Sequence, residues 1–217
     1  MRIKTLTFFS QSHLRLYKTF MNSYPVHTNV DLVIRYIPQN GDGDYRENDS
    51  HFTQQMKNKV ILILDYLKNL QDDELLFFLD IDVIFYRSFY EDLIELFTTS
   101  GKDMLIQTDG PALCAGQFVV KKTDNVLSLF TRVLDNMDEY QHDQHALNKL
   151  LPDSNVSYET LPVRYYSYGA WNGYKRWAGE TDFYVPLDIV THHLNWTVGV
   201  DNKLKMSDAV KNILTKK

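Results

Sequence analysis

The chain has 217 residues, a formal net charge of −5 and 44% hydrophobic residues, a composition typical of a globular protein with a sizeable core. The weakly acidic charge leaves no basic patch for nucleic acid, and no apolar run reaches the ~18–20 residues of a membrane span. The single cysteine, Cys114, excludes an intrachain disulfide and a thiolate metal cluster. Because the N-terminus lacks the pattern of a signal peptide, we expect a cytoplasmic protein.

The first third of the chain predicts alternating strands and helices. Short apolar runs at residues 5–9 and 31–37 predict two strands, and helical spacing of apolar residues predicts a helix over 14–23 between them. Such a strand–helix–strand unit is typical of a parallel sheet. The polar, glycine-rich stretch 38–50 predicts an exposed loop, and residues 52–70 predict a long helix.

Two carboxylates interrupt the apolar run at residues 75–86, LLFFLDIDVIFY. The aromatic and β-branched residues predict one buried strand, in which a carboxylate is costly unless it is paired or bound to a cation. Because residues two apart in a strand share a face, we expect Asp80 and Asp82 to face one site and to bind a divalent cation together. The alternative is a strand that ends at Asp80 and turns into solvent.

The rest of the chain predicts further short elements, without an internal repeat or a linker. The expected strands and helices are a helix at 91–97 ended by Gly101, strands at 104–107, 117–120 and 189–193, and helices at 126–137, 144–151 and 209–214. The aromatic, glycine-punctuated stretch 165–177 predicts a binding loop. One α/β domain spanning residues 1–217, with a mixed sheet, accounts for this order.

Two further segments carry residues suited to a metal site or to catalysis. In 191–196, THHLNW, alternation along a strand would aim only one of His192 and His193 at a given site, and buried structural histidines are the alternative. Carboxylates select Mg²⁺ or Mn²⁺, and an imidazole beside them favours Mn²⁺. Asp143 is either functional or a helix N-cap or first-turn carboxylate. Residue spacing alone predicts a metal-dependent α/β enzyme.

Four segments together resemble the nucleotide-diphospho-sugar transferases of the GT-A fold. They are LDIDVIF, CAGQFVV, DQHALN and HHLNWTVGVDNK, in the family's order between Lys59 and Lys203. The resemblance implies a single GT-A-type α/β domain with a mixed, mostly parallel central sheet flanked by helices. The chain is also similar to the compact glycosyltransferases that chlorella viruses encode for capsid glycans, which would place it in the host cytoplasm.

The resemblance implies a role for the matched residues around a metal ion, Mn²⁺ or Mg²⁺. Asp82 would bind the metal directly, Asp80 would be shared between the metal and the ribose, and His193 would be the third ligand. The metal would bridge the two phosphates of a UDP-sugar as Lewis acid and template. Lys203 would assist at the pyrophosphate, and Lys59 would lie near phosphate.

The same resemblance implies contacts to the donor sugar and the base. Ala115 and Gly116 would line the sugar, while Asp143 and Gln144 would lie near its anomeric carbon. This Asp-Gln pair is similar to that of retaining members such as glycogenin and bacterial galactosyltransferases, so we expect retention during transfer to a hydroxyl of a glycan or protein-linked acceptor. The base, most often uracil, would contact the loop formed by Phe9, Ser10 and Gln11.

Two departures and two alternative functions accompany this resemblance. Gln117 stands where relatives have an aromatic or aliphatic residue, and the 165–177 stretch has no counterpart. A DxD after an apolar strand also resembles aspartyl-nucleophile phosphatases, in which Asp80 would attack phosphorus and Asp82 would be the general acid. A non-catalytic sugar-binding or nucleotide-sugar-binding module would keep the metal but would not need Asp143 and Gln144.

Overall fold

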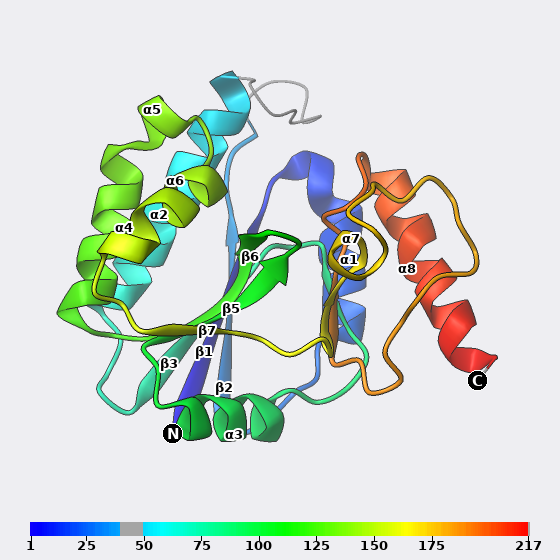
Figure 1. Ribbon diagram of the computed structural model, residues 1–217, viewed down its shortest axis with the longest axis horizontal. Coiled ribbons are helices and arrows are strands. Elements are labelled where there is room, and N and C mark those ends of the chain that lie inside the picture. The colour runs from blue at the N-terminus through cyan, green and yellow to red at the C-terminus, as the bar shows by residue number, and fades with distance from the viewer. Residues whose placement is uncertain (40–49, 217) are drawn as a thin grey trace.

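The computed structural model describes residues 1–39 and 50–216 (Figure 1), so most of the loop expected at 38–50 lies outside the described residues. The centre of the fold is a six-stranded sheet with the order β2-β1-β3-β6-β5-β7. Its strands are β1 (Arg2–Phe9), β2 (Val30–Tyr36), β3 (Glu74–Leu79), β5 (Met104–Asp109), β6 (Ala112–Lys121) and β7 (Tyr158–Thr160).

Strand direction in this sheet agrees with the mixed, mostly parallel sheet expected from the sequence. β1 is parallel to both β2 and β3, and β5 is parallel to β7. Within this sheet β6 alone runs against the others, because it is antiparallel to β3 and is joined to β5 by a tight turn. β6 also begins earlier than the predicted residue 117, so Ala115 and Gly116 lie inside the strand.

A second, smaller sheet corrects the prediction of one continuous strand over 75–86. β3 ends at Leu79, a turn follows, and β4 (Val83–Phe85) pairs with β9 (Thr191–His193), which pairs in turn with β8 (Tyr165–Ser167). The backbone N–H of Val83 donates to the Asp80 carbonyl at 3.1 Å, which closes the turn. The chain does turn at Asp80, but not into solvent, because Asp82 is buried.

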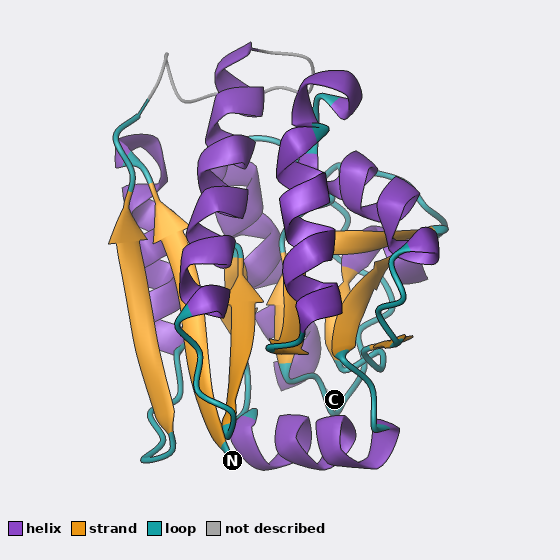
Figure 2. Cartoon of the chain, turned by 90° about the vertical axis from the view of Figure 1, so that its left-hand side faces the viewer, coloured by secondary structure: helices purple, strands orange, loops and turns teal. Residues whose placement is uncertain are grey.

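Helices cover both faces of the central sheet (Figures 1 and 2). They are α1 (Leu14–Ser23), α2 (Ser50–Lys68), α3 (Tyr90–Ser100), α4 (Asp124–Asp135), α5 (Met137–Tyr140), α6 (Asp143–Leu150), α7 (Tyr168–Trp171) and α8 (Val200–Thr215), with short 3₁₀ turns at Gln11–His13 and Leu151–Asp153. The helix predicted at 14–23 is confirmed, whereas α8 begins nine residues before the predicted 209. None of the helices within the described residues combines the length and apolar character needed to cross a membrane.

The two sides of β3 divide the core into two clusters. Leu76 and Phe78 pack with α2 and α4, while Leu75 and Phe77 point the other way and pack with α1, α3 and α8. This is the two-residue alternation of a strand that is buried on both faces. Both faces of the central strand are therefore closed to solvent, and the open end of the sheet is left to carry the polar side chains.

The prediction of a binding loop at 165–177 is wrong for the first half of that stretch. Tyr165, Tyr166 and Tyr168 are among the largest fully buried side chains, and the first two belong to β8. Their hydroxyl groups explain how such residues enter a core, since Tyr165 donates a hydrogen bond to Asp92 at 2.8 Å. The second half does reach the surface, where Trp171 is 45% exposed and Tyr174 is 62% exposed.

Gly101 ends α3 as predicted, and its role can be isolated. It adopts the left-handed conformation at φ +63°, and no atom lies within 4 Å of the position that a Cβ atom would take, so an added methyl group meets only backbone strain. We expect Gly101→Ala to lower the free energy of unfolding by about 1 kcal/mol. Gly101→Asn is the control, because Asn tolerates this conformation, and it should cost less. Urea unfolding of both variants measures the difference; equal losses would contradict the assignment.

Candidate functional site

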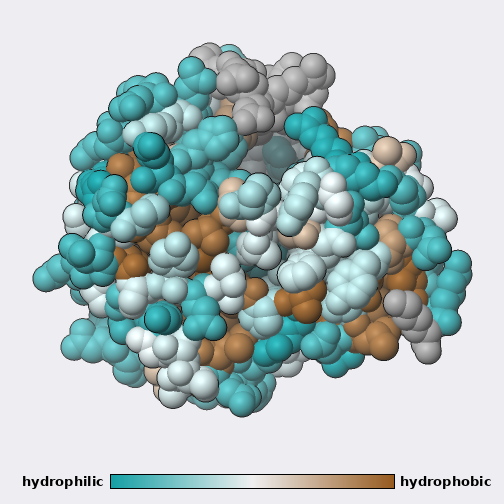
Figure 3. Space-filling model, viewed as in Figure 1, coloured by the Kyte–Doolittle hydropathy of each residue, from teal (hydrophilic) through white to brown (hydrophobic). Residues whose placement is uncertain are grey.

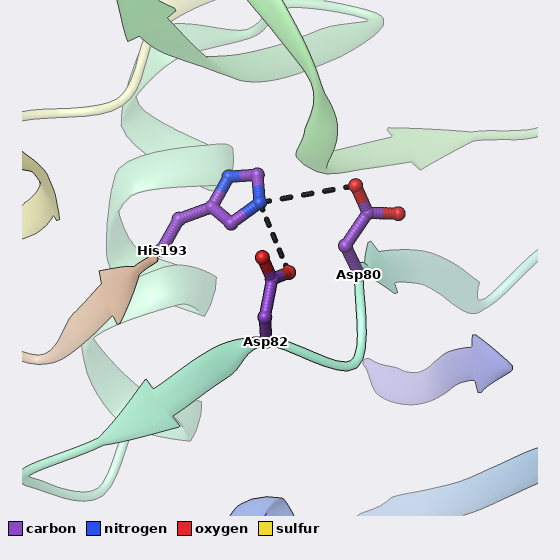
Figure 4. A group of neighbouring side chains, drawn as sticks. All are labelled: Asp80, Asp82 and His193. Carbon is purple, nitrogen blue, oxygen red and sulfur yellow. Dashed lines mark ion pairs between the residues drawn. The ribbon is translucent and has the colours of Figure 1, made fainter. Parts of the chain in front are cut away.

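The turn between β3 and β4 brings two carboxylates to the carboxyl end of the central sheet, where open α/β sheets bind ligands. His193 on β9 joins them, because Val83 and His193 are register partners. The His193 Nε2 atom lies 3.2 Å from Asp82 Oδ1 and 3.8 Å from Asp80 Oδ2 (Figure 4). The side chain of Asp80 is 29% exposed, whereas those of Asp82 and His193 are nearly buried.

These three side chains form a donor set that fits a divalent cation. One ligand atom from each of Asp80, Asp82 and His193 lies within 4.8 Å of the others. Two carboxylates and one imidazole suit Mn²⁺ or Mg²⁺, which prefer oxygen and tolerate nitrogen ligands. The geometry also separates the two histidines as alternation predicted, since His192 is buried away from the acids against the Tyr166 ring.

Lys203 from α8 neutralises the more buried acid. Its Nζ atom donates to Asp82 Oδ2 and, at 3.0 Å, to the Leu194 carbonyl. Burial alone would raise the pKa of Asp82, but Lys203 and His193 outweigh burial and hold that pKa well below its usual value. The carboxylate is therefore ionised and available to a cation. Lys203, proposed from the sequence for the pyrophosphate, lies directly beside the expected metal position.

Lys59 from α2 links the metal cluster to the Asp-Gln pair. The Nζ atom lies 3.0 Å from Asp80 Oδ1 and 2.9 Å from Asp143 Oδ2, and the side chain is only 3% exposed. Burial lowers the pKa of Lys59, but Asp143 and Asp80 outweigh it and raise that pKa. Conversely, burial raises the pKa of Asp143, and Lys59 brings it far below its usual range. Both groups are therefore charged inside the protein.

The surroundings of Asp143 decide between the sequence alternatives for it. The N-cap of α6 is His142, whose Nδ1 atom accepts from the Gln144 N–H at 3.1 Å. Asp143 is the first residue of the helix, so the N-cap alternative is wrong and the first-turn alternative holds. Its carboxylate also points inward and pairs with Lys59, so its contacts are not limited to the end of the helix.

Gln144 is held between β6 and Asp109, an acid for which the sequence analysis predicts no role in the site. The Gln144 Oε1 atom accepts from the Ala115 N–H at 3.2 Å, and its Nε2 atom donates to Asp109 Oδ2 at 2.9 Å. The other oxygen of Asp109 accepts from Asn195 Nδ2 and Trp196 Nε1 at 2.9 and 2.7 Å. Asp109 thus joins two later segments of the site, the start of α6 and the residues after β9.

Gly116 leaves room for the metal cluster. A Cβ atom built on it would lie 2.3 Å from His193 Cε1 and 2.5 Å from Asp80 Oδ2, both too close for any side chain. Its carbonyl also accepts the Asp80 N–H at 2.8 Å. The family resemblance implies that Gly116 lines the donor sugar. Its close packing against Asp80 and His193, the two expected ligands, is a second reason why this position needs a glycine.

The segment expected at the base lies after β1, at the same end of the sheet. Phe9 stacks on Tyr17 with ring centroids 4.4 Å apart, Ser10 is buried, and Gln11 is exposed. The following His13 lies near the acids: burial lowers its pKa, and the charge of Asp82 acts against that shift. The loop is therefore adjacent to the metal cluster, as parallel neighbouring strands require.

Comparisons with known proteins agree with this arrangement. The family model for nucleotide-diphospho-sugar transferases matches residues 18–206. A comparison with curated protein sequences found no significant match.

Three solved structures have a similar fold. The chain is similar to a glycosyltransferase involved in glycosylation of the major capsid of PBCV-1, at 12% identity and a TM-score of 0.65, covering 96% of this chain and 100% of that one. It is similar to the glycosyltransferase GlyE of Streptococcus pneumoniae TIGR4, at 15% identity and a TM-score of 0.56, covering 100% and 63%. It is also similar to the galactosyltransferase LgtC, solved with donor and acceptor sugar analogs, at 11% identity and a TM-score of 0.54, covering 96% and 95%.

The extent of the family match and the shared architecture agree with the DxD-like turn and the late His-x-Asn segment. The resemblance drawn from the four sequence segments is therefore confirmed, whereas the phosphatase alternative receives no support. The chain belongs to the nucleotide-diphospho-sugar transferase family and has the GT-A glycosyltransferase fold.

Proposed function

We propose that this protein transfers a sugar from a UDP-sugar to a hydroxyl of a glycan or protein-linked acceptor, with retention of anomeric configuration. The observation that carries the proposal is the convergence of Asp80, Asp82 and His193 with Lys203 at the carboxyl end of the sheet. Mn²⁺, or Mg²⁺, held by these three residues would supply Lewis-acid stabilisation of the departing diphosphate. The cytoplasmic location and the extent of the catalytic domain, residues 1–217, stay predictions.

The two lysines have different proposed roles because their partners differ. Lys203 contacts Asp82 near the protein surface and can place its ammonium group against a diphosphate oxygen. Lys59 is buried with Asp80 and Asp143 on either side of its ammonium group. These two ion pairs support a role for Lys59 in positioning both acids. The family resemblance implies instead a place for Lys59 near phosphate.

The proposed reaction centre is the amide of Gln144. Its polar atoms lie between the Ala115 backbone and Asp109, next to the segment proposed for the donor sugar. Asp143 lies one residue earlier, buried and paired with Lys59, so we assign it the role of holding this end of α6 in place. Retention rests on the similarity of this pair to retaining members of the family.

Exposed aromatic side chains support an acceptor site beside this centre. The Tyr174 ring lies over Gly110, where an added Cβ would approach it to 2.7 Å, and Gly110 directly follows Asp109. Trp171 is exposed in the same segment, and Figure 3 shows apolar and intermediate residues among polar ones on the face that it draws. Flat apolar rings next to polar groups suit the faces of a sugar.

A thermal-shift screen tests the donor proposal. UDP, GDP and CMP are each added with and without Mn²⁺, because a ligand that binds only the native state raises its stability by mass action. We expect a rise in Tm only when UDP and Mn²⁺ are both present, equivalent to about 2.7 kcal/mol at about 100 times the Kd. If GDP were the only nucleotide to raise the Tm, the base of the donor would be guanine and not uracil. If no nucleotide raised the Tm, the proposal would be contradicted.

Asp82→Ala tests the metal assignment in the same assay. The substitution removes one expected ligand, so the shift that requires both UDP and Mn²⁺ should disappear. Asp208→Ala is the matched control, because that carboxylate is exposed on the same helix that carries Lys203. An Asp82→Ala protein that keeps the wild-type shift would disprove the ligand role.

Gln144→Ala separates catalysis from donor binding. We expect Mn²⁺-dependent UDP affinity to be retained and turnover to fall by about 10²-fold, since a polar group at the reacting centre is lost. The readouts are UDP affinity by calorimetry and UDP release from a UDP-sugar with acceptor. Gln54→Ala is the control, because Gln54 is an exposed glutamine of α2 whose amide donates to Asn58 and not to the residues around Gln144.

Equal losses of affinity and turnover in Gln144→Ala would indicate a structural role. Unchanged turnover would favour the non-catalytic binding module that the sequence leaves open. Asp143→Ala is less informative, because it removes the buried partner of Lys59 and leaves only the half-buried Asp80, and loss of a buried partner costs about 3–5 kcal/mol of stability.

A further inference from the structure

Two buried glutamines lie behind the metal cluster, where a core would ordinarily place apolar residues. Gln107 on β5 and Gln117 on β6 are both fully buried. The pairing of β5 and β6 shifts register between Ile106 and Gln107, and such a bulge re-aims the side chain that follows it. A buried amide is costly unless all its polar atoms are bonded, so the bonds of this pair indicate what it does.

Acceptors that cannot donate fix the orientation of the Gln107 amide. Its Nε2 atom lies 3.0 and 3.1 Å from the backbone carbonyls of Tyr165 and Tyr166, and 3.0 Å from Gln117 Oε1. A carbonyl oxygen can only accept, so the NH₂ end of Gln107 faces β8. Gln117 is oriented in turn, because its Nε2 atom donates to Thr191 Oγ1 at 2.7 Å.

The fixed amide then dictates which nitrogen of His193 carries a proton. Gln107 Oε1 lies 3.1 Å from His193 Nδ1, and an amide oxygen only accepts, so Nδ1 must be the N–H donor. The Cys114 sulfur lies 3.3 Å from the same nitrogen and accepts from the Gly116 N–H. Nε2 faces Asp82 and Asp80, whose oxygens also only accept, so the metal-free ring carries a second N–H there and is positively charged. A cation bound between Nε2 and the acids would replace that proton, while Nδ1 keeps its N–H on Gln107.

We propose that Gln107 is a positioning residue that holds His193 in the Nδ1–H form, with Nε2 directed at a divalent cation. This inference rests on the metal-dependent function proposed above and goes beyond it by naming the residue behind the histidine. Ligating histidines need such an acceptor at the second nitrogen. A neutral amide supplies it without adding another negative charge next to Asp80 and Asp82.

The test compares three variants in metal-free and metal-bound protein. In protein saturated with diamagnetic Mg²⁺, the ring ¹⁵N shifts and the hydrogen exchange of the His193 Nδ1–H report whether that proton is hydrogen-bonded, and titration calorimetry with Mn²⁺ alone reports affinity. Wild type should show an Nδ1–H that is protected from exchange. Gln107→Leu should lose most of that protection and have an affinity lower by about 10–100-fold, the usual cost of losing such a partner.

Two further variants guard against a merely structural effect. Gln107→Glu can accept from Nδ1 while its protonated oxygen donates to a carbonyl, so it should keep the protected Nδ1–H. Gln117→Leu removes a neighbouring buried amide but leaves both backbone carbonyls on Gln107 Nε2, so it should cost less affinity than Gln107→Leu. If Gln107→Leu does not fold, Gln107→Glu and Gln117→Leu still test the assignment through the exchange of the Nδ1–H.

The outcomes separate this inference from the proposed function. A fully protected Nδ1–H in Gln107→Leu, or an unprotected one in Gln107→Glu, would overturn the role of Gln107 even if Mn²⁺ binds. Wild-type protein that takes up neither Mg²⁺ nor Mn²⁺ would overturn the metal-dependent function, and with it the purpose assigned to Gln107.

Discussion

The need to neutralise carboxylates inside the protein ties this fold together. The buried Asp82 and Asp143 and the half-buried Asp80 lie at the open end of the sheet, and each is paired with a lysine side chain. Lys59 comes from α2 on one face of the sheet and Lys203 from α8, which packs with the cluster on the other face. Because an uncompensated buried charge costs several kcal/mol, the same ion pairs that shape the site hold helices from both faces against it.

The break between β3 and β4 places the acids where these pairs can form. Asp80 directly follows Leu79, the last residue of β3 in the central sheet. Asp82 directly precedes Val83, the first residue of β4 in the small sheet. The register of β4 with β9 then brings His193 opposite Val83, next to Asp82. A continuous strand would have buried both acids between the helix layers. The turn brings them to the edge of the sheet, where Asp80 keeps access to solvent.

Local patterns in the sequence predicted the elements and the acids, but not the pairings between distant segments. Apolar residues are buried both before the turn, in β3, and after it, in β4. The pattern of apolar residues therefore could not show where the first sheet ended. Gln107 and His193 are 86 residues apart, and no local spacing relates them. Asp109 lies in a local Asp-Gly-Pro sequence, and nothing in that local pattern indicates its three side-chain donors, one from Gln144 and two from the segment after β9.

The charges of the site also explain why a diphosphate should need a metal ion there. Three carboxylates face two lysines, and His193 adds at most one further positive charge, so these groups have no net positive charge to offer a diphosphate. Lys59 is already held by two acids, which leaves Lys203 as the cation nearest the expected phosphates. One ammonium group cannot offset both the acids and a diphosphate. A divalent cation between them would offset both, and the Nε2 atom that Gln107 directs at the acids is suited to hold it.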